Sequence, residues 1–172
     1  MSLSMYRLSV PVFIRGLGVL RDYLDHAERF EKEKGLPPDT LAAARLAPDM
    51  LPLAGQVQRA SDTSKNAIGR LTDIVPPSFA DDETTLEALR RRIDATVAFF
   101  ESIDADALAE AERKRVSLNF GKVKPTFDGL EYLLTFVLPN FHFHVATAHD
   151  ILRSQGVAVG KADYLGSFAQ YE

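Results

Sequence analysis

Three of the four histidines lie in the ten-residue segment from Asn140 to His149. Histidine is the side chain best suited to exchanging protons near neutral pH and to binding a metal ion. On a helix that turns about 100° per residue, Asn140 and His144 lie one turn apart on the same face. His142 and His149 fall on the opposite side, where we expect them in solvent or at an interface. Asn140 and His144 are therefore the candidate site residues of this segment.

The spacing of the histidines does not suit a metal chelate. His144 and His149 lie about 140° apart around a helix, and His142 and His149 share a face but are two turns apart. The chain contains no cysteine, which excludes thiolate ligands, disulfides and cysteine nucleophiles. A structural role also stays open, in which His144 is a core residue hydrogen-bonded to Asn140, Gln56 or a buried water. An unpaired buried polar group costs about 1–3 kcal/mol.

The segment from Asp128 to Gly156 is predicted to form the helix that carries these residues. Its apolar residues recur at intervals of three and four, which is typical of a helix with one buried face. Thr126 or Asp128 is predicted to cap the start of this helix, and Gly156 to end it. Pro139 has no N–H to donate, which predicts a kink or a restart there. The stripe consists of Leu130, Leu133, Leu134, Val137, Phe141, Ala148 and Ile151.

Three further amphipathic helices are predicted before this one, and the first runs from Met5 to about Lys34. Pro11 is favoured in a first turn, so we expect the helix proper to begin near it, with Ser9 or Val10 as the boundary residue. His26 lies in this helix among charged neighbours and is predicted to face solvent.

The second and third helices are predicted from their start signals. Asp49 can accept hydrogen bonds from the free N–H groups of a first turn, so it is predicted to open the second helix. Gln56 then lies at the edge of the buried face of that helix. Thr84 followed by Glu87 matches a capping box and predicts the start of the third helix. The run Arg90 to Arg92 is mixed with acidic residues and is interpreted as a solvated face.

Between Lys114 and Phe127 the apolar period changes to two, which predicts β-strands. The two strands, Arg115–Phe120 and Val123–Phe127, flank Gly121-Lys122, a pair that suits a two-residue turn needing a positive φ at its first position. The tail after Gly156 is predicted to cover the bundle without regular structure. The patterns together predict an all-α fold, a four-helix bundle with a small β-hairpin before the last helix.

The composition fits a single domain spanning residues 1–172. With 172 residues, 46% of them hydrophobic, the chain can bury one sizeable core. The net charge of −4 argues against binding to nucleic acid or to an anionic membrane, which requires an excess of Lys and Arg. No segment reads as a secretion signal or a membrane span. We therefore expect a soluble, cytoplasmic protein with no nucleic-acid or membrane partner.

Several motifs distributed from the first helix to the tail are similar to those of an uncharacterised branch of the DinB/YfiT-like superfamily. The resemblance covers essentially the whole chain and implies a DinB-like four-helix bundle. Its motifs are Arg45-Leu46-Ala47-Pro48-Asp49-Met50-Leu51-Pro52-Leu53, Leu138-Pro139-Asn140-Phe141-His142-Phe143-His144, Ile151-Leu152-Arg153 with Gly156, and Gly160-Lys161-Ala162-Asp163-Tyr164-Leu165-Gly166.

The resemblance also implies a position for a metal site. The wider superfamily includes divalent-metal proteins that use one His of the second helix and a His-x-x-x-His pair on the last. The corresponding positions here are Gln56, Asn140 and His144, of which only His144 matches. Two amides and one imidazole are a poor donor set for Zn²⁺ or Ni²⁺. We expect no cofactor, and if a zinc or nickel ion is held, these three residues are its ligands.

Two functions remain open. The first is a non-catalytic or relic bundle protein that binds a small molecule in a polar pocket between the second and last long helices. The alternative is a divalent-metal-dependent transferase or hydrolase with His144 as a ligand, so the sequence does not decide whether the protein is an enzyme. Phe136 and Phe143 widen the apolar surface of the last helix, from which we expect a homodimer. The predicted pocket residues are Gln56, Asn140, His144, Tyr132 and Asp49.

Overall fold

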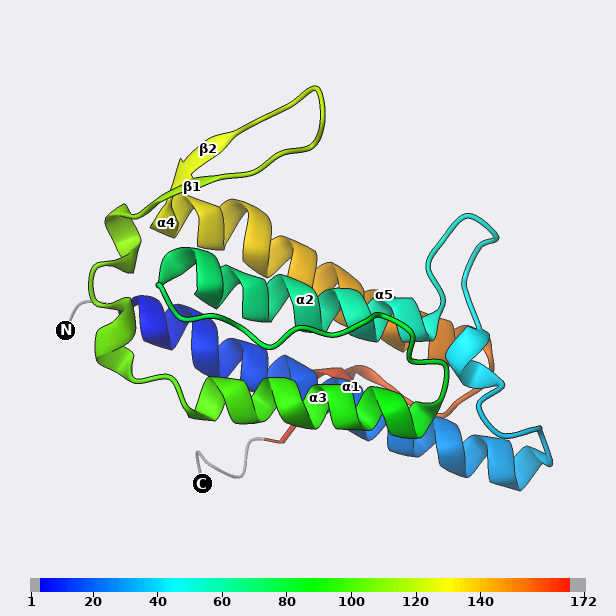
Figure 1. Ribbon diagram of the computed structural model, residues 1–172. Helices are drawn as coiled ribbons and strands as arrows, with labels where there is room; N and C mark the ends of the chain where they lie inside the picture. Colours follow the sequence, from blue (N-terminus) through cyan, green and yellow to red (C-terminus); the bar gives the residue numbers. More distant parts are fainter. Residues whose placement is uncertain (1–3, 168–172) are drawn as a thin grey trace.

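The computed structural model describes residues 4–167, which contain a bundle of four long helices (Figure 1). Helices α2 and α5 pack along each other, and so do α1 and α3; α2 also contacts α3, and α1 also contacts α5. The predicted all-α bundle is therefore confirmed. Within the described residues, no helix is long and apolar enough to cross a bilayer. The long helices are α1 (Met5–Lys34), α2 (Leu53–Leu71), α3 (Leu86–Glu101) and α5 (Leu138–Ser154).

The centre of the core is aromatic. Phe13 of α1 packs against Phe100 of α3 and Phe141 of α5, with ring centroids 5.5 and 5.2 Å apart. Gly16 faces the same ring of Phe141, and a Cβ at this position would lie 2.4 Å from it. The close approach of α1 to α5 therefore requires a glycine at this position. This contact fixes the side of α5 that carries Phe141 toward the core.

The first helix begins earlier than its proline predicts. Helix α1 starts at Met5, where the Ser4 hydroxyl accepts a hydrogen bond from the backbone N–H of Arg7 at 3.3 Å. The predicted boundary at Ser9 or Val10 is wrong because Pro11 lies inside the helix on its exposed side. The carbonyl that loses its partner there can be hydrated, so the proline is tolerated.

Two other predicted helix starts are also displaced. Helix α2 begins at Leu53 after Pro52, and the exposed Asp49 does not cap it, because it lies four residues before the helix in a turn. Helix α3 is capped by Thr85 and not by Thr84, since the Thr85 hydroxyl accepts from the N–H of Ala88 at 3.1 Å. A short 3₁₀ turn, η1 (Leu41–Ala43), precedes α2.

The helical segment before Pro139 is partly π-helical, which accommodates the missing N–H of that residue. It consists of α4 (Gly129–Glu131) and a π-helical stretch, η4 (Tyr132–Val137), which continues into α5. The predicted disturbance at Pro139 is thus a π-helical stretch upstream of the proline. Asp128 occupies the predicted cap position, but its carboxylate pairs with Arg115 at 2.6 Å and does not cap the helix.

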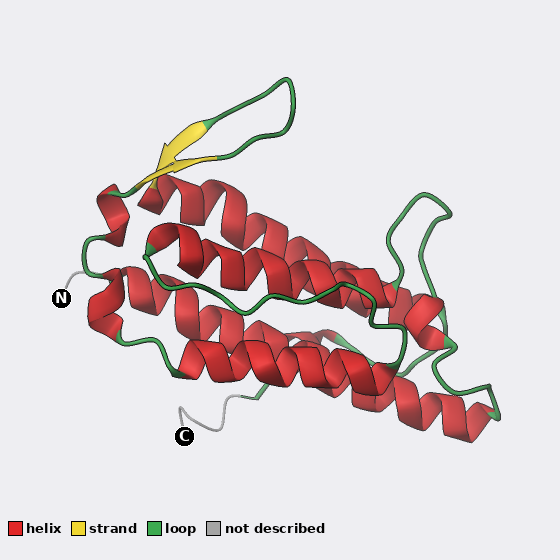
Figure 2. Ribbon diagram, in the orientation of Figure 1, coloured by secondary structure: helices red, strands yellow, loops and turns green. Residues whose placement is uncertain are grey.

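The predicted hairpin is confirmed before this last helical segment (Figure 2). Strands β1 (Arg115–Ser117) and β2 (Thr126–Asp128) pair antiparallel, with Val116 opposite Phe127. A further bridge pairs Phe120 with Val123 beside the turn, where Gly121 has a φ of 76°. Two 3₁₀ turns, η2 (Ala105–Leu108) and η3 (Ala111–Arg113), join α3 to the hairpin.

The tail after α5 is more ordered than predicted. Gly156 adopts a φ of 90° as the last helix ends, and the buried side chains of Val157 and Val159 then hold the chain against the bundle. A short helix, α6 (Lys161–Leu165), contacts α1, so the prediction of a tail without regular structure is wrong. Helix α6 has only five residues, which is too short for a helical period to be recognised in the sequence.

Candidate functional site

The candidate site begins with a hydrogen bond between the two predicted residues Gln56 and His144. The Nδ1 atom of His144 on α5 lies 2.8 Å from the Oε1 atom of Gln56 on α2. The amide nitrogen of Gln56 donates to the carbonyl of Leu51 at 3.0 Å, which fixes the orientation of the amide. Because Gln56 presents its oxygen, His144 Nδ1 must donate the proton. Neutral His144 therefore carries its proton on Nδ1, and its Nε2 is an acceptor.

The surroundings of His144 keep its imidazole uncharged. The side chain is only 8% exposed. Burial, with a smaller contribution from the positive charge of Arg59, lowers the pKa of His144 from 6.5 to about 4. The residue is thus neutral throughout the physiological range and cannot act as a pH switch there.

Asn140 lies one turn from His144 but points to a different residue of α2. Its amide nitrogen donates to the Thr63 hydroxyl at 2.9 Å. Because Asn140 is partly exposed, its Oδ1 atom can be hydrated. The structure therefore brings Gln56 and His144 into contact as predicted, and places Asn140 beside them as part of a second, separate bond.

A third bond joins the same two helical segments near the hairpin. The guanidinium of Arg70 donates to the Tyr132 hydroxyl at 3.0 Å. Burial raises the pKa of Tyr132 above its ordinary value, although Arg70 acts in the opposite direction. We call the three bonds from Gln56, Thr63 and Arg70 the polar ladder. Its residues on α2 are seven apart, so they repeat every two turns on one side of the helix.

Two of the predicted pocket residues do not join His144. Tyr132 is fully buried and lies twelve residues from His144, about 18 Å along the helix, so it does not line a pocket mouth beside that residue. Asp49 is exposed in the loop before α2 and makes no hydrogen bond or ion pair within residues 4–167. The loop before α2 contributes the backbone carbonyl of Leu51, which accepts a hydrogen bond from the Gln56 amide.

The remaining histidines divide between surface and interior. His142 is exposed, as predicted. His149 is partly buried, and its Nδ1 lies 2.8 Å from the hydroxyl of Tyr23, a fully buried residue of α1. His149 was predicted to lie in solvent or at an interface, but it contacts α1 of the same chain, because the buried side of α5 is wide enough for α1 to cover this residue as well. His26 is partly exposed and lies 3.9 Å from Asp163.

A buried ionic cluster that the sequence patterns did not predict lies on the opposite side of α2. The Arg92 side chain is 1% exposed and reaches carboxylates of Asp62, Asp81 and Glu83 at 2.6 to 3.0 Å. The interpretation of Arg90 to Arg92 as a solvated face is thus wrong for Arg92. Arg92 lies three residues after Leu89 on the apolar stripe of α3, and this position was the signal in the sequence that its side chain is buried.

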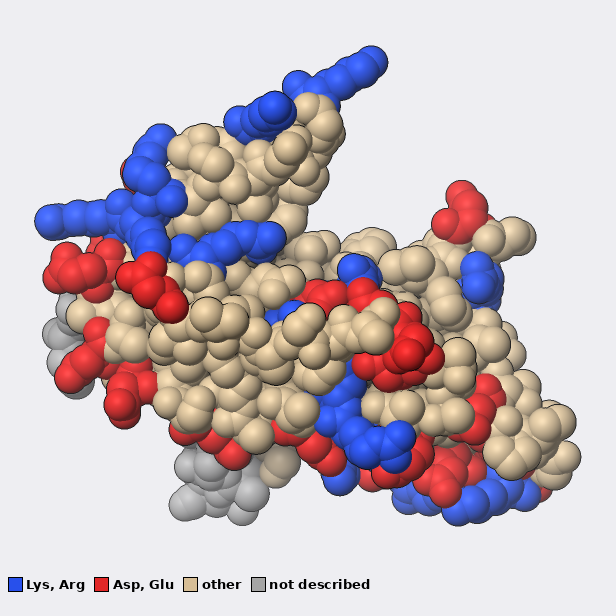
Figure 3. Space-filling model, in the orientation of Figure 1, with Lys and Arg blue, Asp and Glu red and all other residues tan. Residues whose placement is uncertain are grey.

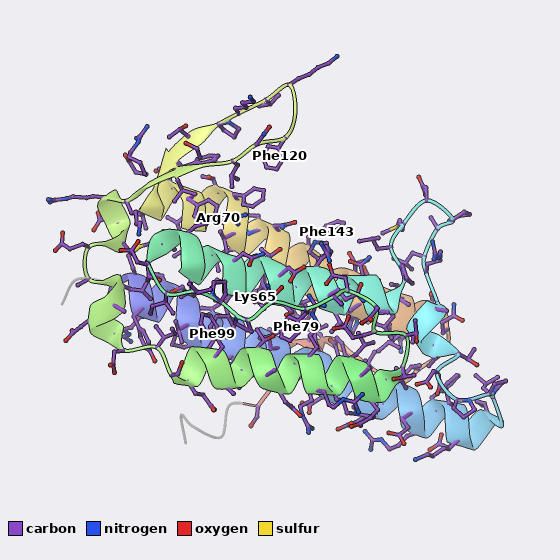
Figure 4. All side chains as sticks on the ribbon, viewed as in Figure 1. Lys65, Arg70, Phe79, Phe99, Phe120 and Phe143 are labelled. Carbon is purple, nitrogen blue, oxygen red and sulfur yellow. The ribbon has the colours of Figure 1, made fainter. Side chains whose placement is uncertain are left out.

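Further ion pairs and cation–π contacts complete this ionic cluster. Arg59 and the buried Lys65 also pair with Asp62, and Arg59 pairs with Asp81, so three cations face three carboxylates. The ring of Phe79 lies 4.6 Å from the guanidinium carbon of Arg92 and 5.5 Å from the Lys65 ammonium. Figure 4 shows Lys65 and Phe79 between α2 and α3. The cluster contains equal numbers of positive and negative charges, and it holds the long connection between α2 and α3 against both helices.

The polar ladder differs because it leaves hydrogen-bond acceptors open. Among the described residues, Arg92 Nε is the single fully buried side-chain nitrogen or oxygen without a hydrogen-bond partner. His144 Nε2 and Asn140 Oδ1 also have no partner in this part of the chain, and must therefore retain contact with the surface. The contact between α2 and α5 thus presents two neutral acceptors, one turn apart on α5.

These donors do not fit the divalent metal implied by the resemblance. The Gln56 amide uses both its oxygen and its nitrogen inside the protein, which leaves one imidazole nitrogen and one amide oxygen. Zn²⁺ and Ni²⁺ in proteins take at least three ligands, with imidazole, thiolate or carboxylate preferred. In the described range, residues 4–167, no group of three or more His, Asp or Glu side chains is arranged to hold a metal ion.

Comparisons with known proteins identify the class of protein to which this four-helix bundle belongs. The chain is similar to a crystal structure of a DinB family member protein from Shewanella denitrificans, with 37% identity, a TM-score of 0.89, and coverage of 95% of this chain and 93% of that one. Residues 5–165 match the domain of unknown function DUF1993. No curated protein matches the sequence. The chain therefore belongs to the DUF1993 family, an uncharacterised branch of the DinB-like superfamily.

Proposed function

We propose that this protein binds a small molecule where α2 and α5 meet beside His144 and Asn140, as a non-catalytic or relic member of the DinB-like superfamily. The observation that carries the proposal is the neutral His144, whose Nδ1–H is held by Gln56 so that Nε2 remains a free acceptor. Asn140 supplies a second acceptor one turn away, because its amide nitrogen is held by Thr63. The site is therefore polar, oriented and uncharged.

The chemistry of these acceptors selects the class of ligand. Two acceptors require a molecule with hydrogen-bond donors, such as hydroxyl or amide N–H groups. A cation is disfavoured because the positive charge of Arg59 already lowers the pKa of His144. An anion lacks the donors that Nε2 and Oδ1 need. We therefore propose a neutral ligand that carries at least two donors, such as a polyol or a primary amide.

One observation favours the alternative of a metal-dependent transferase or hydrolase. A metal-binding histidine commonly donates its other N–H to a carbonyl group, as His144 does toward Gln56. The incomplete donor set argues against this alternative, because Asn140 Oδ1 is the sole additional ligand from the predicted positions.

A binding experiment separates the two functions. A panel of neutral polyols and primary amides is titrated into untagged protein while the imidazole nitrogen signals of His144 are followed by NMR, and ZnCl₂ and NiCl₂ are titrated in parallel. We expect a saturable shift of the Nε2 signal with a member of the neutral panel. His144→Phe should abolish binding, whereas His142→Phe, a change at an exposed neighbour, should not.

Metal analysis of the purified protein is the complementary measurement. We expect less than stoichiometric zinc or nickel in protein prepared without a His-tag. Stoichiometric metal that is lost in His144→Phe and retained in His142→Phe would contradict the proposal and favour the metalloenzyme.

A further inference from the structure

Arg59 lies, along α2, between the two residues of that helix that bind His144 and Asn140. It follows Gln56 by three residues and precedes Thr63 by four, so the three side chains are neighbours on the surface of the helix. The side chain of Arg59 is 39% exposed. The helix register therefore places a cationic hydrogen-bond donor beside the two neutral acceptors on α5.

The charge of Arg59 acts on the His144 ring. Burial makes the largest contribution to the lowered pKa of His144, and the positive charge of Arg59 adds to it. The interaction of two charges weakens as the distance between them grows, so this effect requires the guanidinium to be near the ring. It agrees with the position that the helix register gives to Arg59.

The guanidinium of Arg59 is anchored through one of its nitrogens. Its Nη2 atom pairs with Asp62 at 3.0 Å and with Asp81, which belongs to the long connection between α2 and α3. In Figure 3, acidic and basic side chains lie next to one another over α2 and this connection. Within residues 4–167, the Nε and Nη1 groups of Arg59 make no hydrogen bond. These N–H groups are therefore available to a ligand.

We propose that Arg59 is a specificity-determining residue of the ligand site and that it selects a primary carboxamide. This inference rests on the proposed function, in which the ligand donates hydrogen bonds to His144 Nε2 and Asn140 Oδ1. The nitrogen of a primary amide supplies two N–H donors, and its carbonyl oxygen can accept from Arg59. One functional group of the ligand thus complements all three residues.

The surroundings of Arg59 disfavour the other classes of ligand. A carboxylate would have to approach Arg59 beside Asp62 and Asp81, whose negative charges repel it. An ammonium group is repelled by Arg59 itself. A polyol can donate to both acceptors, but an amide carbonyl oxygen carries a larger partial negative charge than a hydroxyl oxygen and gains more from the guanidinium.

Three probes with the same number of non-hydrogen atoms test the selectivity. Propionamide, propylene glycol and propionate are titrated separately into the protein while the Nε2 signal of His144 is followed by NMR. We expect propionamide to bind about tenfold more tightly than propylene glycol, because a hydrogen bond to a charged donor accounts for at least this ratio. Propionate should leave the signal unchanged.

Substitutions at Arg59 assign the preference to this residue. Arg59→Met should lower the affinity for propionamide about tenfold and leave that for propylene glycol unchanged. Arg59→Lys keeps a charged donor and should retain the preference for the amide. Arg91→Met, at an exposed arginine of α3, is the matched control and should bind like the wild type. Circular dichroism checks that each variant is folded. A preference that survives in Arg59→Met would overturn the proposal.

The titration of His144 is a readout that needs no ligand. Removal of the positive charge in Arg59→Met should raise the pKa of His144 above about 4, whereas Arg59→Lys and Arg91→Met should not. An unchanged titration in Arg59→Met would contradict the position of Arg59 beside the ring. If amide and glycol bind equally well to the wild type, the role of Arg59 fails and the proposed function holds. If no probe moves the Nε2 signal, both fail.

Discussion

Helix α2 contributes to two polar regions of opposite character. Toward α3 it carries the charged cluster around Arg92, and toward α5 it carries the neutral polar ladder from Gln56 to Arg70. In Figure 4, Lys65 and Phe79 mark the charged cluster, and Arg70 marks the end of the polar ladder. The charged region contains the stronger interactions, yet it pairs nearly all of its groups internally. The ladder is weaker and leaves acceptors free.

This difference separates a structural role from a binding role. A buried ion pair whose groups satisfy one another has no capacity left for a ligand, and breaking it exposes an uncompensated charge. Neutral groups near the surface whose hydrogen bonds are only partly made within the protein can exchange water for a ligand at little cost. The strongest electrostatic feature of the molecule is therefore the poorer candidate for a binding site.

The largest effect is expected from Arg92→Met. The substitution leaves the carboxylates of Asp62, Asp81 and Glu83 without their central cation and should destabilise the fold by about 3–5 kcal/mol. Arg91→Met is the control, because Arg91 is largely exposed and should change stability by less than about 0.5 kcal/mol. Urea unfolding measures both. Equal stability of the two variants would show that the cluster is not a structural core.

The next effect is a pH dependence that belongs to the ladder. His144 has a pKa of about 4 in the folded protein and 6.5 when unperturbed, so the unfolded chain binds its proton first as the pH falls. The stability contributed by neutral His144 is fully present above pH 6.5 and is lost between pH 6.5 and about 4. The loss amounts to at most about 3 kcal/mol. His144→Gln, which cannot be protonated, should remove this part of the measured dependence.

Removing the imidazole at neutral pH should have a similar or smaller effect. His144→Ala leaves the Gln56 carbonyl unpaired and should cost about 1–3 kcal/mol. His149→Ala leaves the buried hydroxyl of Tyr23 without a partner and should cost a comparable amount. His142→Ala becomes the neutral control. A His142 variant as unstable as the other two would contradict this ranking.

The smallest effect is expected at the middle bond of the ladder. Thr63→Val removes the acceptor of the Asn140 amide while keeping its shape, and should cost about 0.5–1.5 kcal/mol. The cost is limited because Asn140 is partly exposed and its amide can turn to water. Thermal unfolding measures the difference. A cost as large as that of Arg92→Met would mean that the ladder is as closed as the ionic cluster.

The sequence was sufficient for the fold and for one contact of the site. Apolar periods of three and four located the four long helices, and the change of period with Gly121-Lys122 located the hairpin. The pair of Gln56 and His144 followed from positions on facing helices. Helix starts were displaced at Ser9, Asp49 and Thr84, because a residue that can cap is informative about a helix start only to within a few positions.

The failures concern side chains whose partners are distant in sequence. Tyr23 is 126 residues from His149, and Asp62 is 30 residues from Arg92, so no local pattern indicates either pair. Tyr132 is too far along the helix to reach His144, and it lies in the π-helical stretch, which shifts residues 132–137 relative to α5. Local periodicity identifies the buried face of a helix, but the residues that meet there are decided by packing.

The state of the His144 ring tests the central claim most directly. Long-range ¹H–¹⁵N NMR of the imidazole nitrogens, recorded across pH in metal-free buffer, reports which nitrogen carries the proton and where the ring titrates. We predict a proton on Nδ1, a bare Nε2, and a neutral ring down to pH about 4. A proton on Nε2, or titration near the ordinary pKa of 6.5, would contradict a buried, neutral acceptor held between α2 and α5 by Gln56.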